Sequence, residues 1–167
     1  MTKNPTNISN CFWISPKKFV DERGVFVEIF KNSKSEELFK PKQSNYSFSK
    51  KGVLRGIHRT PYAKYVTCVS GKVYDVCVDL RPSSETYKQY FGIILDSESL
   101  NSLYIPPFCG HAFLAIEDSV LIYQQNQEYD PKLDETFCYK DYSIEWPEEP
   151  TLLSNKDKIA CYEQQRI

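Results

Sequence analysis

The sequence predicts a mainly β protein, folded as a barrel or jelly roll with a site in its mouth. Aromatic residues make up 14% of the 167 residues, among them 12 Tyr and 10 Phe, and aromatic side chains favour strands over helices. Between residues 25 and 146, short apolar segments follow one another at spacings of about ten residues, which is typical of sandwiches and barrels. The length suits a single domain over residues 1–167 with a full core.

Several of these segments are predicted to be strands, because they are rich in β-branched and aromatic residues and are bounded by turn residues. They are Val25–Phe30, Lys64–Ser70, Lys72–Leu80, Phe91–Leu95, Ser102–Ile105, Ala112–Ile116 and Val120–Gln124. The second and third are separated only by Gly71, which predicts a tight hairpin turn between them.

The segment Lys72–Leu80 has two chemically different faces. Side chains alternate along a strand, so one face is apolar while the other carries Asp75 and Asp79. The acidic face is therefore either solvated or lines a polar cavity. Helix signals are sparse: Ser33–Glu36 resembles a capping box, and Ser154–Asp157 predicts the start of a short C-terminal helix.

Composition excludes several classes of partner. The net charge of −1 gives no electrostatic argument for binding a nucleic acid or an anionic membrane. No segment approaches the ~20 apolar residues of a membrane span, and the N-terminus has no apolar signal core. The six cysteines are dispersed without a Cys-x-x-Cys pair, and several lie in apolar strand patterns, where a free thiol behaves as a small hydrophobe. This pattern favours a reduced, cytoplasmic protein.

The chain has only two histidines, His58 and His111, and both lie at expected strand ends near glycines. Imidazole titrates near neutral pH, so a single histidine in a pocket is a natural proton carrier. Metal-binding β-barrels of the cupin type usually present His-x-His and a distant third histidine, a pattern that two histidines 53 residues apart do not match. We therefore expect no bound metal. Serine-hydrolase, P-loop and dinucleotide-binding motifs are absent.

The candidate proton-transfer residues are His58, Lys64, Asp75, Tyr123 and Asp157. Taken singly, each has an ordinary structural explanation, such as a histidine satisfied at a strand end or an aspartate on a solvated face. The sequence that surrounds them favours a functional role.

That surrounding sequence resembles the dTDP-4-dehydrorhamnose 3,5-epimerase family over nearly the whole chain. Four collinear blocks carry the resemblance: residues 19–28 (FVDERGVFVE), residues 43–58 with QSNYS and GVLRGIH, residues 64–81 with KYV and GKVYDVCVDLR, and residues 104–113 with YIP and GHAF. It continues through Tyr123, EYDP at 128–131, IEWP at 144–147 and LSNKD at 153–157. Any one block is weak, but their order along the chain is specific.

The resemblance implies a mainly β, cupin-like jelly-roll barrel with few short helices, which dimerises with strand exchange at its N-terminal edge and uses no metal or cofactor. By position, His58 matches the family's general base and Asp157 the carboxylate that orients it. Tyr123 matches the acid on the opposite face, and Lys64 the cation near the keto oxygen of the sugar. The residues that match nucleotide- and sugar-binding positions are Phe19, Arg23, Glu28, Gln43, Asn45, Arg55, His111 and Tyr129.

The implied activity is inversion of C3, C5 or both in a nucleotide-diphosphate-linked 4-keto-6-deoxy sugar, in the synthesis of bacterial capsule and lipopolysaccharide sugars. One loop departs from the family pattern, which places an aromatic residue and glutamine after the histidine and a longer loop before the lysine. Here Arg59-Thr60 replaces that pair, and Lys64 comes six residues after His58. The shorter loop leaves room for a bulkier sugar or another base, so dTDP-4-keto-6-deoxyglucose and GDP-4-keto-6-deoxy-heptose are both candidate substrates. The presence of Tyr123 favours inversion at both carbons.

Two other functions stay open. A 3,4-ketoisomerase on a related β scaffold would move the carbonyl group instead of inverting a carbon, but such enzymes tend to use paired histidines in the pocket. A non-catalytic barrel that binds sugar nucleotides would have no reason to keep His58, Lys64, Tyr123 and Asp157 together.

Overall fold

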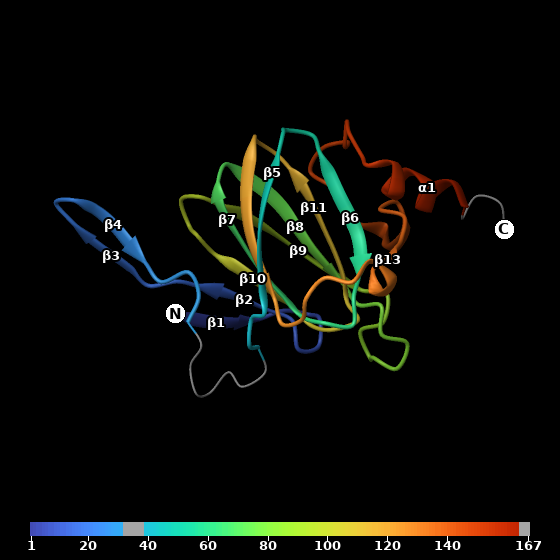
Figure 1. Ribbon diagram of the computed structural model, residues 1–167, viewed down its shortest axis with the longest axis horizontal. Helices are drawn as coiled ribbons and strands as arrows, with labels where there is room; N and C mark the ends of the chain where they lie inside the picture. Colours follow the sequence, from blue (N-terminus) through green and yellow to red (C-terminus); the bar gives the residue numbers. More distant parts are fainter. Residues whose placement is uncertain (32–38, 164–167) are drawn as a thin grey trace.

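The computed structural model describes residues 1–31 and 39–163, and antiparallel strands dominate it (Figure 1). The strands are β1 (Thr2–Pro5), β2 (Phe12–Ser15), β3 (Lys18–Asp21), β4 (Gly24–Val27), β5 (Gln43–Ser49), β6 (Leu54–Arg59), β7 (Lys64–Ser70), β8 (Lys72–Val78), β9 (Tyr90–Asp96), β10 (Ser102–Ile105), β11 (Gly110–Ala115), β12 (Ser119–Gln125) and β13 (Glu135–Thr136). The helical segments are η1 (Pro131–Leu133), η2 (Asp141–Ser143) and α1 (Asn155–Glu163).

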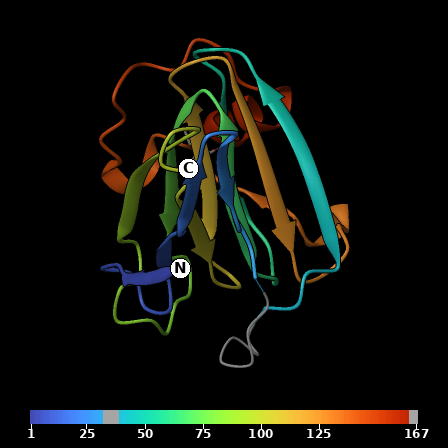
Figure 2. The same cartoon turned by 90° about the vertical axis from the view of Figure 1, so that its left-hand side faces the viewer.

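Two antiparallel sheets pack face to face as a sandwich (Figure 2). One has the strand order β1-β2-β10-β7-β12-β5 and the other the order β13-β6-β11-β8-β9. In the described part of the chain, β3 and β4 pair only with each other, and they project from the sandwich as an arm (Figure 1). The prediction of a mainly β jelly-roll fold is confirmed.

The main core lies between the two sheets, because alternate side chains of each strand point inward. Its fully buried members include Val66 on β7, Val73 on β8 and Leu121 on β12. A second apolar layer forms on the outer face of the five-stranded sheet, where Val76 on β8 is buried in a cluster that the C-terminal segment covers with Trp146. Full burial of each such aliphatic side chain contributes about 1.5–3 kcal/mol.

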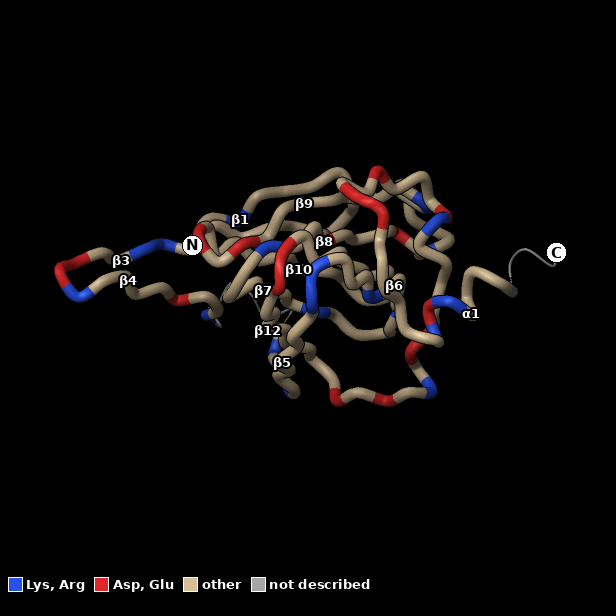
Figure 3. The backbone as a smooth tube through the Cα atoms, turned by 90° about the horizontal axis from the view of Figure 1, so that it is seen from above, with Lys and Arg blue, Asp and Glu red and all other residues tan. Residues whose placement is uncertain are grey.

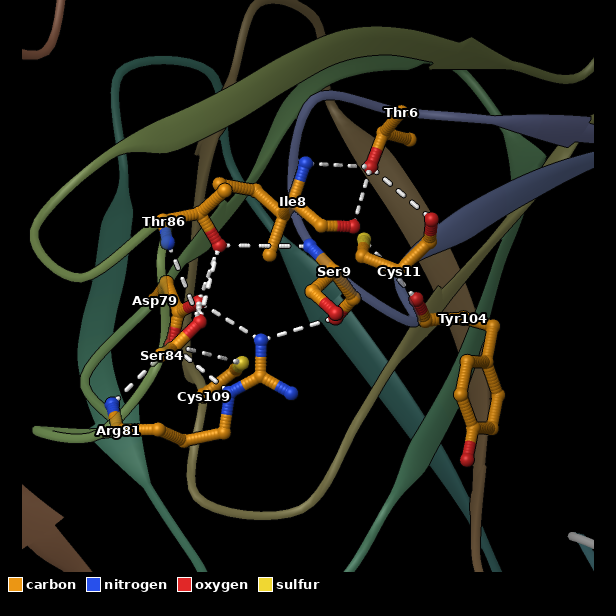
Figure 4. A network of polar contacts seen from close by, with 10 residues as sticks. All are labelled: Thr6, Ile8, Ser9, Cys11, Asp79, Arg81, Ser84, Thr86, Tyr104 and Cys109. Carbon is orange, nitrogen blue, oxygen red and sulfur yellow. Dashed lines mark hydrogen bonds and ion pairs between the residues drawn. The ribbon is translucent and has the colours of Figure 1, made fainter.

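Strand β8 turns its acidic face into the sandwich. Asp75 and Asp79 are completely buried, so the solvated alternative is wrong, and the two carboxylates pair with His111 and Arg81. Asp79 accepts hydrogen bonds of 2.5–2.8 Å from Arg81, Ser84 and Thr86 (Figure 4). Burial alone would raise the pKa of Asp79, but these bonds outweigh it and hold the pKa well below its usual range. Arg81 also donates to a carbonyl oxygen of the β1–β2 connection at 2.9 Å, so the network ties the N-terminal segment to β8.

The predicted hairpin at Gly71 is wrong. Both flanking strands are present, but β7 pairs with β10 and β12 in one sheet, while β8 pairs with β9 and β11 in the other. Gly71 therefore carries the chain from one sheet to the other with φ at +71°, and a Cβ there would lie 2.1 Å from the carbonyl oxygen of Asp118. A hairpin turn and a crossing between sheets both favour glycine, so the local sequence does not distinguish them.

The remaining boundaries differ in detail. β4 (Gly24–Val27) begins and ends earlier than the predicted strand Val25–Phe30, and the other predicted strands agree within two residues at each end. The sequence patterns do not single out β5, which is rich in Ser and Asn and therefore has low strand propensity. The predicted C-terminal helix is confirmed as α1, whereas the capping box at Ser33–Glu36 lies outside the described residues. No helix within residues 1–31 and 39–163 has the length and apolar character that a membrane crossing requires.

Two of the six cysteines form a disulfide. Cys138, which follows β13, is bonded to Cys161 in α1, so the expectation of reduced thiols is wrong for this pair. The bond fastens α1 to the segment after β13, the edge strand that pairs with β6. The other cysteines are buried free thiols, consistent with their apolar surroundings in the sequence: Cys11, Cys68, Cys77 and Cys109.

The arm exposes large apolar side chains. Phe19 pairs with Phe26 and Val20 with Val25 across the two strands, and all four residues are 44–77% exposed. Figure 3 views the arm from above, with adjoining acidic and basic segments at its far end. A free two-stranded ribbon is marginally stable in water, and exposed apolar patches mark interaction surfaces.

Candidate active site

A cavity of about 300 Å³ lies where β5 and β7 begin and β6 and β12 end. It is lined by Gln43, Asn45, His58, Thr60, Tyr62, Lys64, Tyr123, Gln125, Tyr129 and Asp134. The fold therefore brings together predicted catalytic residues from three strands, together with three predicted binding residues. The predicted carboxylate, Asp157, contacts the cavity through His58.

The six-stranded sheet supplies one wall through the alternation of its side chains. In the β7–β12 pair, Lys64 lies opposite Gln125, and Tyr123 precedes Gln125 by two residues on the same face. In the β12–β5 pair, Tyr123 lies opposite Asn45 and Gln125 opposite Gln43. Five polar side chains thus share one end of the inner face of this sheet.

His58 on β6 comes from the other sheet and is held by helix α1. Its Nε2 lies 2.7 Å from Oδ1 of Asp157, which is 2% exposed. Asp157 is fixed in turn by Ser154, whose hydroxyl caps the helix by accepting from the Asp157 amide at 3.1 Å and donates to Oδ2 at 2.8 Å. A carboxylate is also favoured in the first turn of a helix by the helix dipole.

The Asp157 carboxylate sets the state of the imidazole. Burial alone would raise the pKa of Asp157, but the hydrogen bonds from His58 and Ser154 outweigh it and hold the pKa below its usual value. A charged carboxylate therefore faces Nε2 of His58, which keeps the proton on that nitrogen and leaves the lone pair on Nδ1.

Gly56 lets β6 approach β11 closely, two residues before His58. Its φ is +118°, and a Cβ there would lie 2.5 Å from the carbonyl oxygen of His111 and 2.6 Å from Cβ of Ala112. The register of the β6–β11 pair also shifts just beyond this point. The backbone path that presents His58 to the cavity therefore requires glycine at position 56.

Lys64 is a buried cation at the floor of the cavity. It is 7% exposed, and its Nζ lies 3.5 Å from the carbonyl oxygen of His58. Burial lowers the pKa of Lys64 to about 8, although the charges of Asp134 and Asp75 oppose the shift. The ammonium is therefore mostly protonated at pH 7, in a site where little water screens its charge.

Tyr123 presents a phenol from the sheet opposite His58. Burial raises the pKa of Tyr123, and the charge of Arg55 only partly offsets this effect, so the hydroxyl keeps its proton at neutral pH. Arg55 itself lies outside the set of cavity-lining residues and donates to the hydroxyl of Ser49 on β5 at 3.0 Å.

The second histidine belongs to a different pair. His111 lies opposite His58 in the β6–β11 pair, but its Nε2 is 2.7 Å from Oδ1 of Asp75, and neither residue lines the cavity. The structure therefore separates Asp75 from the other candidate proton-transfer residues. Asp75 pairs with His111 instead.

Besides Arg55 and His111, three predicted binding residues lie away from the cavity of their own chain. Phe19 and Arg23 are on the arm, and Glu28 follows β4, where the arm returns toward the sandwich (Figure 1). Within a single copy of the chain, the structure does not bring them to the site.

Four lining residues were not predicted: Thr60, Tyr62, Gln125 and Asp134. Gln125 could have been predicted from the sequence, because it is two residues from Tyr123 in a strand, and residues two apart in a strand point to the same face. Thr60, Tyr62 and Asp134 lie in connections between strands, where no periodicity indicates which side chains turn inward.

This arrangement suits proton transfer at a carbon beside a carbonyl group. An imidazole and a phenol face one cavity from different sheets, and a buried cation that can stabilise an enolate oxygen lines the same cavity. Within residues 1–31 and 39–163, no three His, Cys, Asp or Glu side chains are grouped to hold a metal ion.

Known proteins are similar to this chain in sequence and fold. A family model described as dTDP-4-dehydrorhamnose 3,5-epimerase matches residues 5–164. The chain is 41% identical over 170 residues to the dTDP-4-dehydrorhamnose 3,5-epimerase of Mycolicibacterium smegmatis, covering 96% of this chain and 85% of that protein. It is 38% identical over 171 residues to the dTDP-4-dehydrorhamnose 3-epimerase of Streptomyces niveus, covering 96% and 83%. The crystal structure of the Legionella pneumophila dTDP-6-deoxy-D-glucose-3,5-epimerase in complex with dTDP-4-keto-L-rhamnose is similar with a TM-score of 0.90 at 35% identity, covering 95% of this chain and 90% of that one.

Proposed function

Because the chain belongs to the dTDP-4-dehydrorhamnose 3,5-epimerase family, we propose that it inverts both C3 and C5 of a dTDP-linked 4-keto-6-deoxy sugar without a cofactor. The observation that carries the proposal is the convergence of His58, Lys64 and Tyr123 on one cavity. A ketone at C4 acidifies the C–H bonds at both C3 and C5, so one base can act on the two carbons in turn. We place this reaction in the cytoplasm, in the synthesis of sugars for bacterial surface polysaccharides.

In this mechanism His58 removes the proton. Asp157 holds Nε2 at 2.7 Å, so Nδ1 accepts the proton from the carbon next to the ketone. The electron pair of the C–H bond moves into a carbon–carbon double bond, and the C4 oxygen becomes an enolate. A positioned general base contributes about 10²–10⁴-fold to the rate.

Lys64 stabilises the enolate. The ammonium is buried and carries its charge before the reaction begins, so it needs no reorganisation when negative charge develops on the oxygen. Its lowered pKa also makes it a good hydrogen-bond donor to an oxyanion.

Tyr123 returns a proton to the opposite face of the carbon. Its hydroxyl gives up a proton as the enolate collapses to the ketone, and the carbon is left inverted. The phenolate then regains a proton from solvent while His58 releases the one that it took, so no proton is gained or lost over the cycle. Because Tyr123 comes from the sheet opposite His58, the two groups suit opposite faces of a sugar ring.

The shortened loop bears on the choice of substrate. Its arginine, Arg59, pairs with Glu135 and donates to the carbonyl oxygen of Leu80 at 3.2 Å, outside the cavity. Thr60 and Tyr62 are the loop residues that line the cavity instead. We favour a dTDP-linked hexose as the substrate, and the loop length keeps GDP-4-keto-6-deoxy-heptose as the second candidate.

Deuterium exchange tests the reaction. Incubation in D₂O with dTDP-4-keto-6-deoxyglucose should introduce deuterium at C3 and C5 with inversion at both, detected by NMR. Tyr123→Phe should still exchange deuterium, because the base and cation remain, but inversion should slow by about 100-fold because the acid is gone. The same assay with GDP-4-keto-6-deoxy-heptose, the second candidate substrate, should show slower exchange than the assay with the dTDP-linked hexose.

The other outcomes contradict the proposal in distinct ways. A carbonyl moved from C4 to C3 would identify a 3,4-ketoisomerase. Tight binding of both sugar nucleotides without exchange would identify a binding module. Label at C3 alone would limit the activity to a 3-epimerase.

We also propose that the enzyme is a homodimer in which the arms are exchanged. In the described part of the chain, β5 is an edge strand whose one neighbour is β12, and its residues Gln43 and Asn45 line the cavity. An arm from a second copy, laid near this edge, would cover its own exposed phenylalanines and bring Arg23 toward the cavity. The planar guanidinium group pairs well with a diphosphate.

Disrupting the arm should therefore separate the dimer and reduce activity together. Phe26→Asp places a charge in the apolar face of the arm, so light scattering should report a monomer, with kcat/KM reduced by about 100-fold through lost diphosphate contacts. Ile94→Asp, at an exposed isoleucine on β9 away from the arm, is the matched control. A monomeric native protein with full activity would refute arm exchange.

A further inference from the structure

Besides Asn45, whose Nδ2 is also unpaired, three residues that line the cavity carry buried polar atoms without a hydrogen-bond partner among the described residues. These atoms are the Tyr62 hydroxyl, Nε2 of Gln125 and Oδ1 of Asp134. Tyr62 and Gln125 are 3% and 2% exposed, and the Asp134 side chain is 8% exposed. Buried polar groups in proteins are nearly always paired, because burial without a partner is costly. Three such atoms around one cavity point to a ligand with several hydrogen-bonding groups.

The backbone holds both Tyr62 and Gln125 near Lys64. The amide of Ala63 donates to Oδ1 of Asn126 at 2.9 Å, which ties the loop before β7 to the end of β12. Tyr62 precedes Lys64 by two residues, and Gln125 lies opposite Lys64 in the sheet. The unpaired donors are therefore placed beside the cation that faces the sugar ketone.

The three groups are complementary in hydrogen bonding. Burial and the nearby charge of Asp134 raise the pKa of Tyr62 to about 12, so its hydroxyl keeps its proton and can donate, as does Nε2 of Gln125. Asp134 uses Oδ2 to accept from Lys156 at 2.8 Å and from the Tyr129 hydroxyl at 3.3 Å, which leaves Oδ1 as an acceptor. A sugar hydroxyl both donates and accepts, so it can pair with a donor and an acceptor of this kind at once.

We propose that Tyr62, Gln125 and Asp134 form a sugar-recognition wall, which binds ring hydroxyls of the substrate and selects the 4-keto sugar that is accepted. The inference rests on the proposed function, since it names what holds the hydroxyl groups of that substrate. A carboxylate repels a diphosphate, so the wall serves the sugar and not the nucleotide. Tyr62 lies in the loop where the sequence departs from the family pattern, which gives that loop a part in specificity.

The wall is tested by removing one hydroxyl group from the protein and, separately, one from the sugar. With dTDP-4-keto-6-deoxyglucose, Tyr62→Phe should lower kcat/KM by about 10- to 100-fold, mainly through a higher KM, while the affinity for dTDP alone is unchanged. The 2-deoxy and 3-deoxy forms of the sugar are then compared. Toward the form that lacks the contacted hydroxyl, wild type and Tyr62→Phe should have the same kcat/KM. Tyr74→Phe, on the outer face of β8, is the matched control and should behave as wild type with all three sugars.

Two results would overturn the wall. An equal loss by Tyr62→Phe on the parent sugar and on both deoxy sugars would show that the phenol supports the fold and not a hydroxyl. The second result concerns binding, which calorimetry measures without turnover. Failure of the proposed function would appear as no deuterium exchange by wild type with any sugar. Even then, wild type should bind the intact sugar nucleotide more tightly than dTDP. Tyr62→Phe should lose that preference, and its retention by the variant would refute the wall whatever the reaction.

Discussion

His58→Asn should abolish turnover while leaving the protein folded and able to bind nucleotide. Asparagine has a similar size but no group that accepts a proton at neutral pH. Because a positioned base contributes about 10²–10⁴-fold, kcat should fall by about 1,000-fold or more. NMR in D₂O should show no wash-in of deuterium at either C3 or C5, since one imidazole serves both carbons. Affinity for dTDP should stay at the wild-type value, because the proposed mechanism places His58 against the sugar and not the nucleotide.

Asp157→Asn should have a smaller effect than His58→Asn. It leaves the imidazole in place but removes the charge that faces Nε2 at 2.7 Å, so turnover should fall less than in His58→Asn. The lost charge should slow proton removal at both carbons alike, because the carboxylate stabilises the ring as it takes the proton, and NMR in D₂O measures that rate at each carbon. Exchange that survives His58→Asn at one carbon would show that a second base serves that carbon.

The fold class could be predicted because its signals are local. Strands β7, β8 and β10 follow from runs of β-branched and aromatic residues, and their observed bounds nearly match the predicted ones. Which strands pair is a different matter, since pairing joins residues far apart in the chain. Gly71 illustrates this, because its neighbours predict a hairpin turn while the fold uses it to pass between two sheets.

The site could be predicted where a residue has unusual chemistry or a match to a family pattern. Histidine is rare in this sequence, which draws attention to His58, and Lys64 follows it closely. Asp157 is 99 residues from His58, on a helix, and only the family resemblance connected the two. Tyr62 and Asp134 remained unpredicted because a tyrosine or an aspartate in a loop is common. What distinguishes them is one buried polar atom each without a partner, the Tyr62 hydroxyl and Oδ1 of Asp134, which is a property of the folded structure alone.

Lys64→Met should have the second-largest effect, reducing kcat/KM by about 10²–10³-fold. Removing one preorganised group that stabilises an oxyanion typically has an effect of this size, and methionine nearly preserves the length of the side chain. The variant should be at least as thermally stable as wild type, because a buried charge is replaced by an apolar group. Lys72→Met, at a lysine that pairs with Glu117 on the surface, is the matched control and should retain full activity.

The pH dependence identifies the charge of Lys64 as the cause. Burial lowers the pKa of Lys64 to about 8, so the free enzyme carries the ammonium below pH 8 and loses it as the pH rises through that value. In wild type, kcat/KM should therefore fall on the alkaline side of pH 8, approaching tenfold per pH unit. The pKa values of Tyr62 and Tyr123 are both raised by burial, so neither phenol accounts for a limb in this range. Lys64→Met should lack the limb, and Lys64→Arg, whose guanidinium stays charged, should move it beyond pH 10. A limb near pH 8 that persists in Lys64→Met would assign the titration to another group and remove the electrostatic role given to this lysine.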